Sequence, residues 1–429
     1  MTELKRHLNL PKLTFYGVGD ILGAGIYALV GKVAWEAGGL AWFAFLFAGL
    51  SILPTALSYA ELTSRYPKSG GVSVFAGRAF RRHSIPFVVG FIVLMSGLVS
   101  SAAVANAFHG YLSTLWEVPR GLAIVFFLSF LTFINWRGIA ESSNFNILCV
   151  LAEAGGLLLI IAFGWGHWGE GNFLVGRGGE GFLSRETLEG IGAASILAFY
   201  AAVGFEDICN VSEEVIDPEK TVPKAILLAV SISSLIYIGI ALTVVSVVSI
   251  PELGESKAPL ALVASKIIPF FSPKVIATLA LFSLTNTALA NMIMASRLLY
   301  GMSREGWIFR SFSLVSSRRQ TPVVAVITVF FLTLVLALSG SLKILGQTTS
   351  VIMLSMFIIV HLSLLVIRIR GDKPDSETRL FRIPLVVPFL GILISAFMIT
   401  QAPHEAYLRV GILFGIGFLL SLSMRRFMF

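Results

Sequence analysis

The segment Gly17–Tyr27 reads GVGDILGAGIY and lies inside the first long apolar run of the chain. Each glycine lowers helix propensity by about 1 kcal/mol relative to alanine, so the glycines of this segment weaken the helix that the run would form. A second segment, AFYAAVGFED at Ala198–Asp207, places Gly204 among aromatic residues and before two carboxylates. Close helix packing at small residues is the alternative interpretation. We expect an interrupted helix at both segments.

The runs around these segments belong to a strongly apolar chain. Of 429 residues, 56% are hydrophobic and 13% are charged, and the mean hydropathy is +0.86. Soluble domains carry about a quarter charged residues, so this chain could not cover a water-facing surface. Runs of roughly 20 apolar residues match helices that cross about 30 Å of hydrocarbon. The composition therefore predicts an all-α integral membrane protein, because barrel strands would alternate in polarity.

Polar breaks divide the apolar runs into about twelve predicted spans. They lie near residues 13–34, 40–62, 85–112, 120–137, 143–165, 190–210, 223–249, 271–302, 321–340, 343–367, 383–402 and 407–424. No small-residue cleavage site follows a short apolar core near the N-terminus, so we expect the first span to be retained. Cys149 and Cys209 give neither a disulfide framework nor metal-ligand spacing.

The loops between the predicted spans alternate in charge. One set is basic, and it contains Arg65, Lys68, Arg78, Arg81, Arg82, Arg137, Arg304, Arg310, Arg318, Arg319, Arg368, Arg370, Lys373, Arg379, Arg382, Arg425 and Arg426. The opposite set is poor in net positive charge. The positive-inside rule then places both termini in the cytoplasm of a cell (plasma or inner) membrane, as an even number of spans requires. The net charge of +8 is a topology signal rather than a sign of nucleic-acid binding.

The two glycine-rich segments occupy corresponding places in two halves of five spans each. Because five is odd, the halves would enter the membrane in opposite orientations. Paired interrupted helices of this kind point to the binding site of an inverted-repeat transporter. A half-helix end with free N–H groups suits a carboxylate, and an end with free C=O groups suits an ammonium. An α-amino acid carries both charges, so the pattern favours amino-acid transport.

Four motifs extend over most of the chain. They are GAGIY at 23–27, SYAELTSRYPKSGG at 58–71, GFEDICNVSEEVIDPEKTVPKAI at Gly204–Ile226, and ASRLLYGMSREG at 295–306 followed by Thr321-Pro322. Together they resemble the amino acid–polyamine–organocation (APC) superfamily, within its amino acid permeases. The resemblance implies alternating access and a core of two inverted five-helix repeats, residues 13–165 and 190–367. It also implies a cytoplasmic N-terminus at 1–12 and two peripheral helices in 383–424.

The resemblance further implies which residues hold the substrate. Backbone N–H groups would bind its carboxylate, and backbone carbonyls would bind its amine. The first set is Gly23, Ala24, Gly25 and Ile26; the second is Phe199, Tyr200 and Val203, beside Gly204. Tyr200 falls where the family keeps an aromatic gate over the substrate, with an aromatic ring packed between helices as the alternative. No cofactor is implied.

Glu153 stands in the middle of the fifth predicted span, with no Lys or Arg three or four residues away to pair with it. Ionisable residues inside spans are functional candidates by default. Some members of the family have a lysine at the position aligned with Glu153, near helices where others bind sodium. Burial favours a neutral carboxyl, so we expect Glu153 to couple transport to protons. A structural hydrogen bond to a neighbouring helix and a cation held by Glu153 are the alternatives.

Other polar residues near the breaks have competing interpretations. Asp20 could gate the inward path or cap the second half-helix. Glu206 could stabilise the unwound segment or take part in coupling, and Asp207 could instead face water. The eighth span offers side-chain oxygens for a sodium site as an alternative to proton coupling, and these belong to Ser283, Thr285, Asn286 and Thr287.

Charged residues farther from the breaks have simpler interpretations. We expect a solvated cytoplasmic loop at Glu213, Glu214, Asp217 and Glu219. We expect Arg297, near the end of the eighth span, to extend to the membrane interface. His109 and His361 have no acid–base partner in the sequence, and satisfied buried histidines are the safer interpretation.

These observations predict a proton-coupled symporter that imports amino acids across the lipid bilayer. The alternatives are a permease for polyamines or other organic cations, an amino acid exchanger, and a channel or nutrient sensor on the same scaffold. Glu153 and Glu206 keep a cationic substrate open. An enzyme would need a clustered nucleophile, a metal set or paired catalytic carboxylates, and the scattered histidines and two cysteines supply none.

Overall fold

The computed structural model describes residues 3–171, 173–256, 258–268, 272–339, 343–375, 381–400 and 404–428. The α-helices are α1 (Leu10–Ala37), α2 (Ala41–Arg65), α3 (Gly71–Phe80), α4 (Ser84–Leu112), α5 (Arg120–Arg137), α6 (Ile139–Gly164), α7 (Arg185–Ala201), α8 (Pro218–Val247), α9 (Ile250–Glu255), α10 (Pro259–Ile267), α11 (Pro273–Arg304), α12 (Val323–Ser339), α13 (Lys343–Arg370), α14 (Val386–Thr400) and α15 (His404–Met428). The 3-10 helices are η1 (Gly38–Leu40), η2 (Trp165–His167), η3 (Phe205–Glu214) and η4 (Arg310–Ser313).

Eleven of the twelve predicted spans each coincide with one long helix of this set, and the span near 190–210 covers α7 and the start of η3. In the described part of the chain, 8 helical stretches are long and apolar enough to cross a membrane. Shorter apolar helices lie at Val323–Ser339, Val386–Thr400 and Val410–Ser423. The short helices α3, α9 and α10 lie in segments expected to be loops, because helices of 10, 6 and 9 residues give no long apolar run. The prediction of an all-α membrane protein is confirmed.

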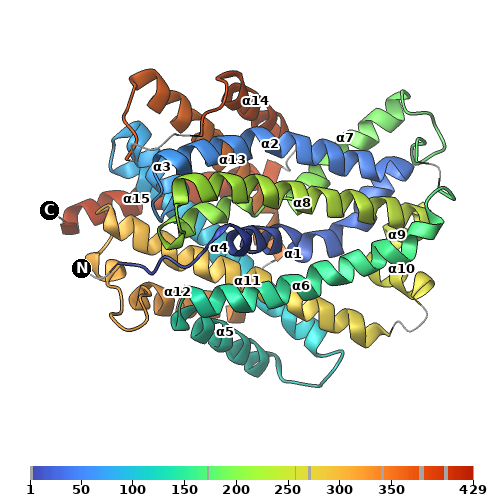
Figure 1. Ribbon diagram of the computed structural model, residues 1–429, viewed down its shortest axis with the longest axis horizontal. Coiled ribbons are helices and arrows are strands. Elements are labelled where there is room, and N and C mark those ends of the chain that lie inside the picture. Colours follow the sequence, from blue (N-terminus) through green and yellow to red (C-terminus); the bar gives the residue numbers. More distant parts are fainter. Residues whose placement is uncertain are drawn as a thin grey trace.

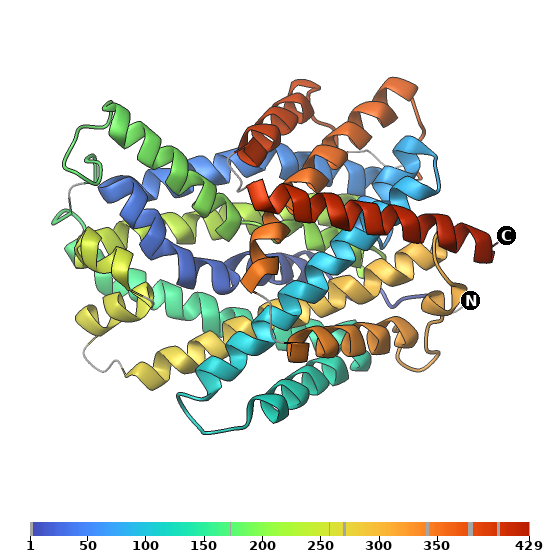
Figure 2. The ribbon, with the colours of Figure 1, turned by 180° about the vertical axis from the view of Figure 1, so that it is seen from behind.

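The long helices run along the long axis of the molecule, and both termini lie at the same end (Figure 1). α1 lies inside the bundle and packs against α6, α7, α8 and α11. α14 packs against α13 and α2, and α15 packs against α4 and α13 (Figures 1 and 2). The first interrupted segment is therefore enclosed by helices from both halves of the sequence.

Large apolar side chains cover the outside of the bundle. Phe126 on α5, Leu235 on α8 and Leu393 on α14 are 74%, 69% and 66% exposed. A water-soluble monomer rarely exposes extensive apolar patches of this kind. Hydrocarbon makes such a surface favourable, provided that the backbone polar groups are paired within helices.

The segment before α1 is tied to the end of η3. Leu8 is fully buried and pairs with Val215 in an isolated β-bridge. The backbone N–H groups of His7 and Leu8 donate to the Glu214 carbonyl at 2.8 and 3.0 Å, and Ile216 N–H donates to the Leu8 carbonyl at 2.8 Å. The chain entering the first interrupted helix is thus joined to the chain leaving the second.

Candidate transport site

α1 consists of two half-helices. Gly23 has φ −10° and ψ −165°, outside the helical range, and the break falls in the predicted GAGIY segment. Just past the break, a Cβ atom on Gly25 would lie 3.0 Å from the Ala201 Cα atom of α7. A side chain at this position would therefore push the two helices apart. The interruption expected from the glycines is confirmed.

The second break follows α7. The helix ends at Ala201, and Gly204 has φ 136°, which a residue with a side chain rarely adopts. The chain continues as η3, a 3-10 helix of 10 residues. Such runs rarely exceed 3–4 residues and often mark a hinge or a strained sequence. The second interruption is also confirmed, and its second half is 3-10 rather than α-helical.

The two breaks lie against each other. A Cβ atom on Gly204 would lie 2.9 Å from both the carbonyl carbon and the carbonyl oxygen of Asp20. The Tyr237 hydroxyl of α8 lies 2.6 Å from the Ile21 carbonyl oxygen and 2.8 Å from the Ala201 carbonyl oxygen. A hydroxyl carries one proton, so the two carbonyls share it. The Tyr237 side chain therefore donates to backbone carbonyls from both breaks.

Sequence reasoning missed Tyr237. The residue is 1% exposed and stands in the apolar run SLIYIGIAL. A buried tyrosine usually finds a hydrogen-bond partner for its hydroxyl, so its position in a span was an available signal. Its partners could not be read from the sequence, because they lie 216 and 36 residues away.

Three carboxyl groups are buried beside the breaks. Glu206 Oε2 accepts a hydrogen bond from Gly204 N–H at 2.9 Å, which ties the unwound segment to the start of η3. Asp20 and Asp207 are 8% and 5% exposed, so both carboxyl groups lie inside the bundle. The expectation that Asp207 faces water is wrong.

Glu153 on α6 is fully buried and faces α11. Ser283 Oγ donates to Glu153 Oε1 at 2.6 Å, so the structural hydrogen bond to a neighbouring helix exists. Glu153 Oε2 and Thr287 Oγ1 are buried and have no hydrogen-bond partner in the described part of the chain. A Cβ atom on Gly23 would lie 2.6 Å from Thr287 Oγ1. Polar side chains therefore lead from Glu153 to the break in α1.

The predicted substrate positions lie around the two breaks. Ile26 and Phe199 are buried, and the Phe199 ring meets Phe357 edge to face at 6.2 Å. The Phe199 carbonyl already accepts a hydrogen bond from Ala202 N–H at 3.0 Å, and a carbonyl has a second lone pair. Tyr200 and Val203 are half-buried. The Ala24 side chain lies outside the described part. The roles of Gly23–Ile26 and Phe199–Gly204 in substrate binding stay predictions.

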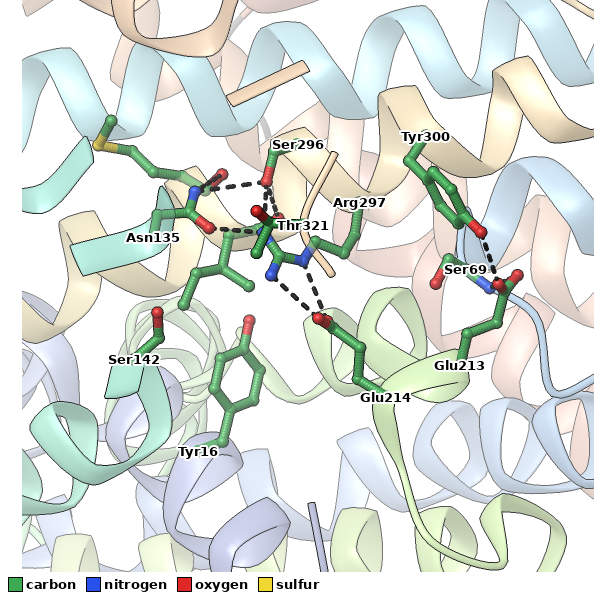
Figure 3. Close-up of polar contacts among 12 residues, drawn as sticks. Tyr16, Ser69, Asn135, Ser142, Glu213, Glu214, Ser296, Arg297, Tyr300 and Thr321 are labelled. Carbon is green, nitrogen blue, oxygen red and sulfur yellow. Dashed lines mark hydrogen bonds and ion pairs between the residues drawn. The ribbon is translucent and has the colours of Figure 1, made fainter. Parts of the chain in front are cut away.

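A buried ion pair fixes the far end of η3 (Figure 3). Arg297 Nε and Nη2 donate to the two carboxylate oxygens of Glu214, each at 3.0 Å, and both side chains are fully buried. Arg297 Nη1 also donates to Asn135 Oδ1 on α5 and to Ser296 Oγ. The expectations that Glu214 is solvated and that Arg297 extends to the interface are both wrong.

The neighbouring Glu213 binds to other elements. Its carboxylate accepts hydrogen bonds from the Tyr300 hydroxyl of α11 and from Ser69 N–H, each at 3.2 Å (Figure 3). Asp217 is exposed, as expected for the loop. His361 is a satisfied buried histidine, as expected, with hydroxyls of Thr55 and Ser58 at 3.1 and 3.0 Å. η3 is therefore attached to α5, α11 and the loop after α2.

Residues 8–414 match the family model described as amino acid permease. The chain belongs to the amino acid permease family. The resemblance to APC amino acid permeases is thereby confirmed, and with it the prediction of a transporter rather than an enzyme.

Three relatives show the range of this permease's family. A branched-chain amino acid permease of Bacillus subtilis (strain 168) is 28% identical over 427 residues, which cover 92% of this permease and 88% of the relative. Cationic amino acid transporter 4 of Mus musculus is 30% identical over 398 residues, 88% of this permease and 62% of the relative. A methylthioribose transporter of Bacillus subtilis (strain 168) is 25% identical over 439 residues, 97% of this permease and 92% of the relative. Their names cover three different substrate classes.

Proposed function

We propose that this permease is a secondary active transporter that imports amino acids by alternating access, coupled to protons. One observation carries the proposal: two helix breaks from opposite halves of the chain lie against each other inside the bundle. Gly25 touches the end of α7, Gly204 touches α1, and the Tyr237 hydroxyl serves carbonyls from both. Interrupted helices that meet in a bundle are the arrangement in which transporters of this kind bind substrate.

The backbone at the breaks offers the two charges that an amino acid needs. The N-terminal end of the second half of α1, at Gly23–Ile26, would hold the substrate carboxylate through N–H groups and the helix dipole. The carbonyl end of α7, at Phe199, Tyr200 and Val203, would hold the ammonium. Because Tyr237 occupies the Ala201 carbonyl, the neighbouring carbonyls are the ones available to the substrate.

Inverted repeats at 13–165 and 190–367 would give this site its two access routes. α1 and α7 are the first long helices of the two repeats; α1 is broken at Gly23, and α7 is followed by the break at Gly204. Access from one side would open when one repeat tilts against the other. Both termini lie at one end of the molecule, which supports a location on the same side of the membrane (Figure 1). The basic loops would place that side in the cytoplasm, with the protein in the cell membrane.

Glu153 would carry the coupled proton. It is fully buried, its Oε2 has no hydrogen-bond partner among the described residues, and its Oε1 is held by Ser283. Protonation would remove a charge from the interior and let α1 move past α6 and α11 without carrying an ion through hydrocarbon. Asp20 and Glu206 would gate the path, with Glu206 held to Gly204 N–H, and Tyr200 would cover the substrate.

A cationic substrate is the second candidate. Asp20, Glu206 and Asp207 place three buried carboxyl groups at the breaks, and an ionised pair of them would attract an additional positive charge. Arginine, lysine or a polyamine would then compete with neutral amino acids.

The test is uptake into liposomes that contain the purified protein. Labelled leucine, arginine and putrescine would be offered with an inward proton gradient, an inward sodium gradient, or neither. Wild type would be compared with Glu153→Gln, which keeps the shape but not the titration. Glu141→Gln is the matched control, since Glu141 lies on the same helix and is exposed.

We expect an inward proton gradient to drive accumulation of leucine by wild type and Glu141→Gln. In Glu153→Gln, we expect uptake to fall to the rate without a gradient, with exchange retained. Sodium-driven uptake would overturn the proton assignment and keep the transporter. Preferred uptake of putrescine or arginine would select the cationic class. Binding without uptake by a folded protein would overturn transport in favour of a sensor.

A further inference from the structure

A cavity of about 480 Å³ lies at the end of the molecule that carries both termini. It opens between the end of α3, the start of α4, the loop after α11 and the loop after α13. Tyr66, Trp307 and Pro86 form apolar parts of its wall. Cavities of roughly 300–1,000 Å³ are the size that small ligands occupy. The two helix breaks do not contribute to its lining.

The lining of the cavity is basic. Arg78, Arg81, Arg82 and Lys373 face two carboxylates, Asp372 and Glu305. These two carboxylates are already paired. Asp372 binds Arg81 at 2.7 Å and Arg370 at 3.7 Å, and Glu305 binds Lys68 at 3.1 Å.

Two of these cations form no ion pair with a carboxylate in the described part of the chain. Arg82 and Lys373 are exposed, and neither forms an ion pair within the described residues. Cations that line one concave surface without carboxylate partners raise its electrostatic potential and attract anions. No carboxylate in the described part of the protein neutralises the positive charges of Arg82 and Lys373.

A buried donor points to the same ligand class. Arg78 Nε is buried and lacks a hydrogen-bond partner among the described residues. Arg78 binds Asp375 through Nη2 at 3.1 Å, so only part of its donor fork is engaged. Buried polar atoms are normally satisfied, so orphaned ones in a cavity wall call for a missing partner. An anion would supply an acceptor for the arginine.

The N-terminus of α4 adds the partial positive charge of a helix dipole to the cavity. His83 is the N-cap residue, and its side chain makes no capping hydrogen bond to the first turn. Instead, His83 Nε2 bonds to the Gly306 carbonyl at 3.2 Å, and Pro86 lines the cavity. α4 has 29 residues, so its N-terminus carries a helix dipole close to the cavity. Anions bind readily at such helix ends.

We propose that this cavity binds a phosphate group, carried either by an anionic phospholipid headgroup or by a small soluble phosphate ester. Arg82 and Lys373 supply the attraction, Arg78 supplies a directed donor, and the α4 N-terminus supplies the dipole. Arginine and lysine at the ends of membrane helices are common partners for lipid phosphates. The inference is independent of the transported substrate, since it rests on residues away from the helix breaks.

The test uses the full-length protein and two probes. Glycerol 3-phosphate is titrated calorimetrically into detergent-purified protein, and native mass spectrometry measures retention of phosphatidylglycerol against phosphatidylcholine. The variant is Arg82→Gln with Lys373→Gln. The control is Arg185→Gln with Lys274→Gln, which removes the same charge from exposed positions at the start of α7 and α11.

We expect at least one probe to bind wild type and the control, and to bind the Arg82/Lys373 variant about tenfold or more weakly. Binding of glycerol 3-phosphate identifies a soluble ester, and selective retention of phosphatidylglycerol alone identifies a lipid headgroup. Absence of binding by both probes would overturn the proposal. Equal weakening in the variant and the control would also overturn it, because attraction would then follow net charge and not this cavity.

Discussion

The middle of the bundle and the two buried ion-pair clusters at its terminal end hold their polar groups in different ways. Beside the helix breaks, Glu153 Oε2, Asn286 Nδ2 and Thr287 Oγ1 have no hydrogen-bond partner in the described part of the chain. At the terminal end, Arg297 and Glu214 bind through two parallel hydrogen bonds. Glu61, also at that end, is bound by Arg65, Arg368 and the Ile383 N–H.

This difference separates two tasks. A saturated network fixes one geometry, since breaking it leaves a charge unpaired in a low-dielectric interior. Unsatisfied donors and acceptors do the opposite, because they gain from a ligand, a proton or a second conformation. We infer that these ion-pair clusters hold η3 and α2 in place, whereas the unsatisfied groups in the middle can bind a ligand or a proton and release it.

The largest loss of stability is expected when the buried ion pair between Arg297 and Glu214 is broken. Glu214→Gln leaves the Arg297 guanidinium fully buried without a counter-charge, and we expect it to lower the free energy of unfolding by about 3–5 kcal/mol. Thermal unfolding of the detergent-purified protein measures the change. Glu213→Gln is the control, because Glu213 binds only neutral donors and should cost about 1 kcal/mol. Equal unfolding temperatures for the two variants would contradict the special role of the ion pair.

A double variant separates stability from transport. Arg297→Met with Glu214→Leu removes both charges, and replacing a buried pair with apolar residues is often neutral or stabilising. We expect the unfolding temperature to return close to that of wild type. Wild-type uptake by this variant would confirm that the pair only holds η3 in place. Slowed uptake in a stable double variant would show that its charges take part in opening.

A smaller effect is expected at the junction of the two breaks. Tyr237→Phe removes the hydroxyl that serves the Ile21 and Ala201 carbonyls, so we expect a loss of about 1–3 kcal/mol and slower amino-acid uptake. Tyr59→Phe is the matched control. The Tyr59 hydroxyl is also buried but has no partner within the described residues, so its removal should leave stability equal or higher. Similar results for both tyrosines would show that the junction does not depend on Tyr237.

The same division explains what the sequence could predict. Long apolar runs and clustered glycines are local signals, and they located every long helix and both breaks. Hydrogen bonds between distant helices are not local. Arg297 and Glu214 are 83 residues apart, and near the end of an apolar run an arginine that reaches water cannot be told from one that is paired inside. The expectation for Asp207 was wrong for the same reason, because its burial beside the breaks depends on helices that are distant in the sequence.

The smallest effect on stability is expected where a polar group is already unsatisfied. Thr287→Val replaces a buried hydroxyl that has no partner among the described residues with a methyl group of similar size. Removing an unsatisfied group costs nothing in lost hydrogen bonds, so we expect the free energy of unfolding to change by less than about 1 kcal/mol. The informative readout is uptake under the two ion gradients. If protons alone drive transport, Thr287→Val keeps its proton stimulation, and sodium has no effect in either protein. If wild type responds to sodium and the variant does not, Thr287 supplies a ligand beside Glu153, and its lone hydroxyl belongs to a cation site and not to a site poised for protons.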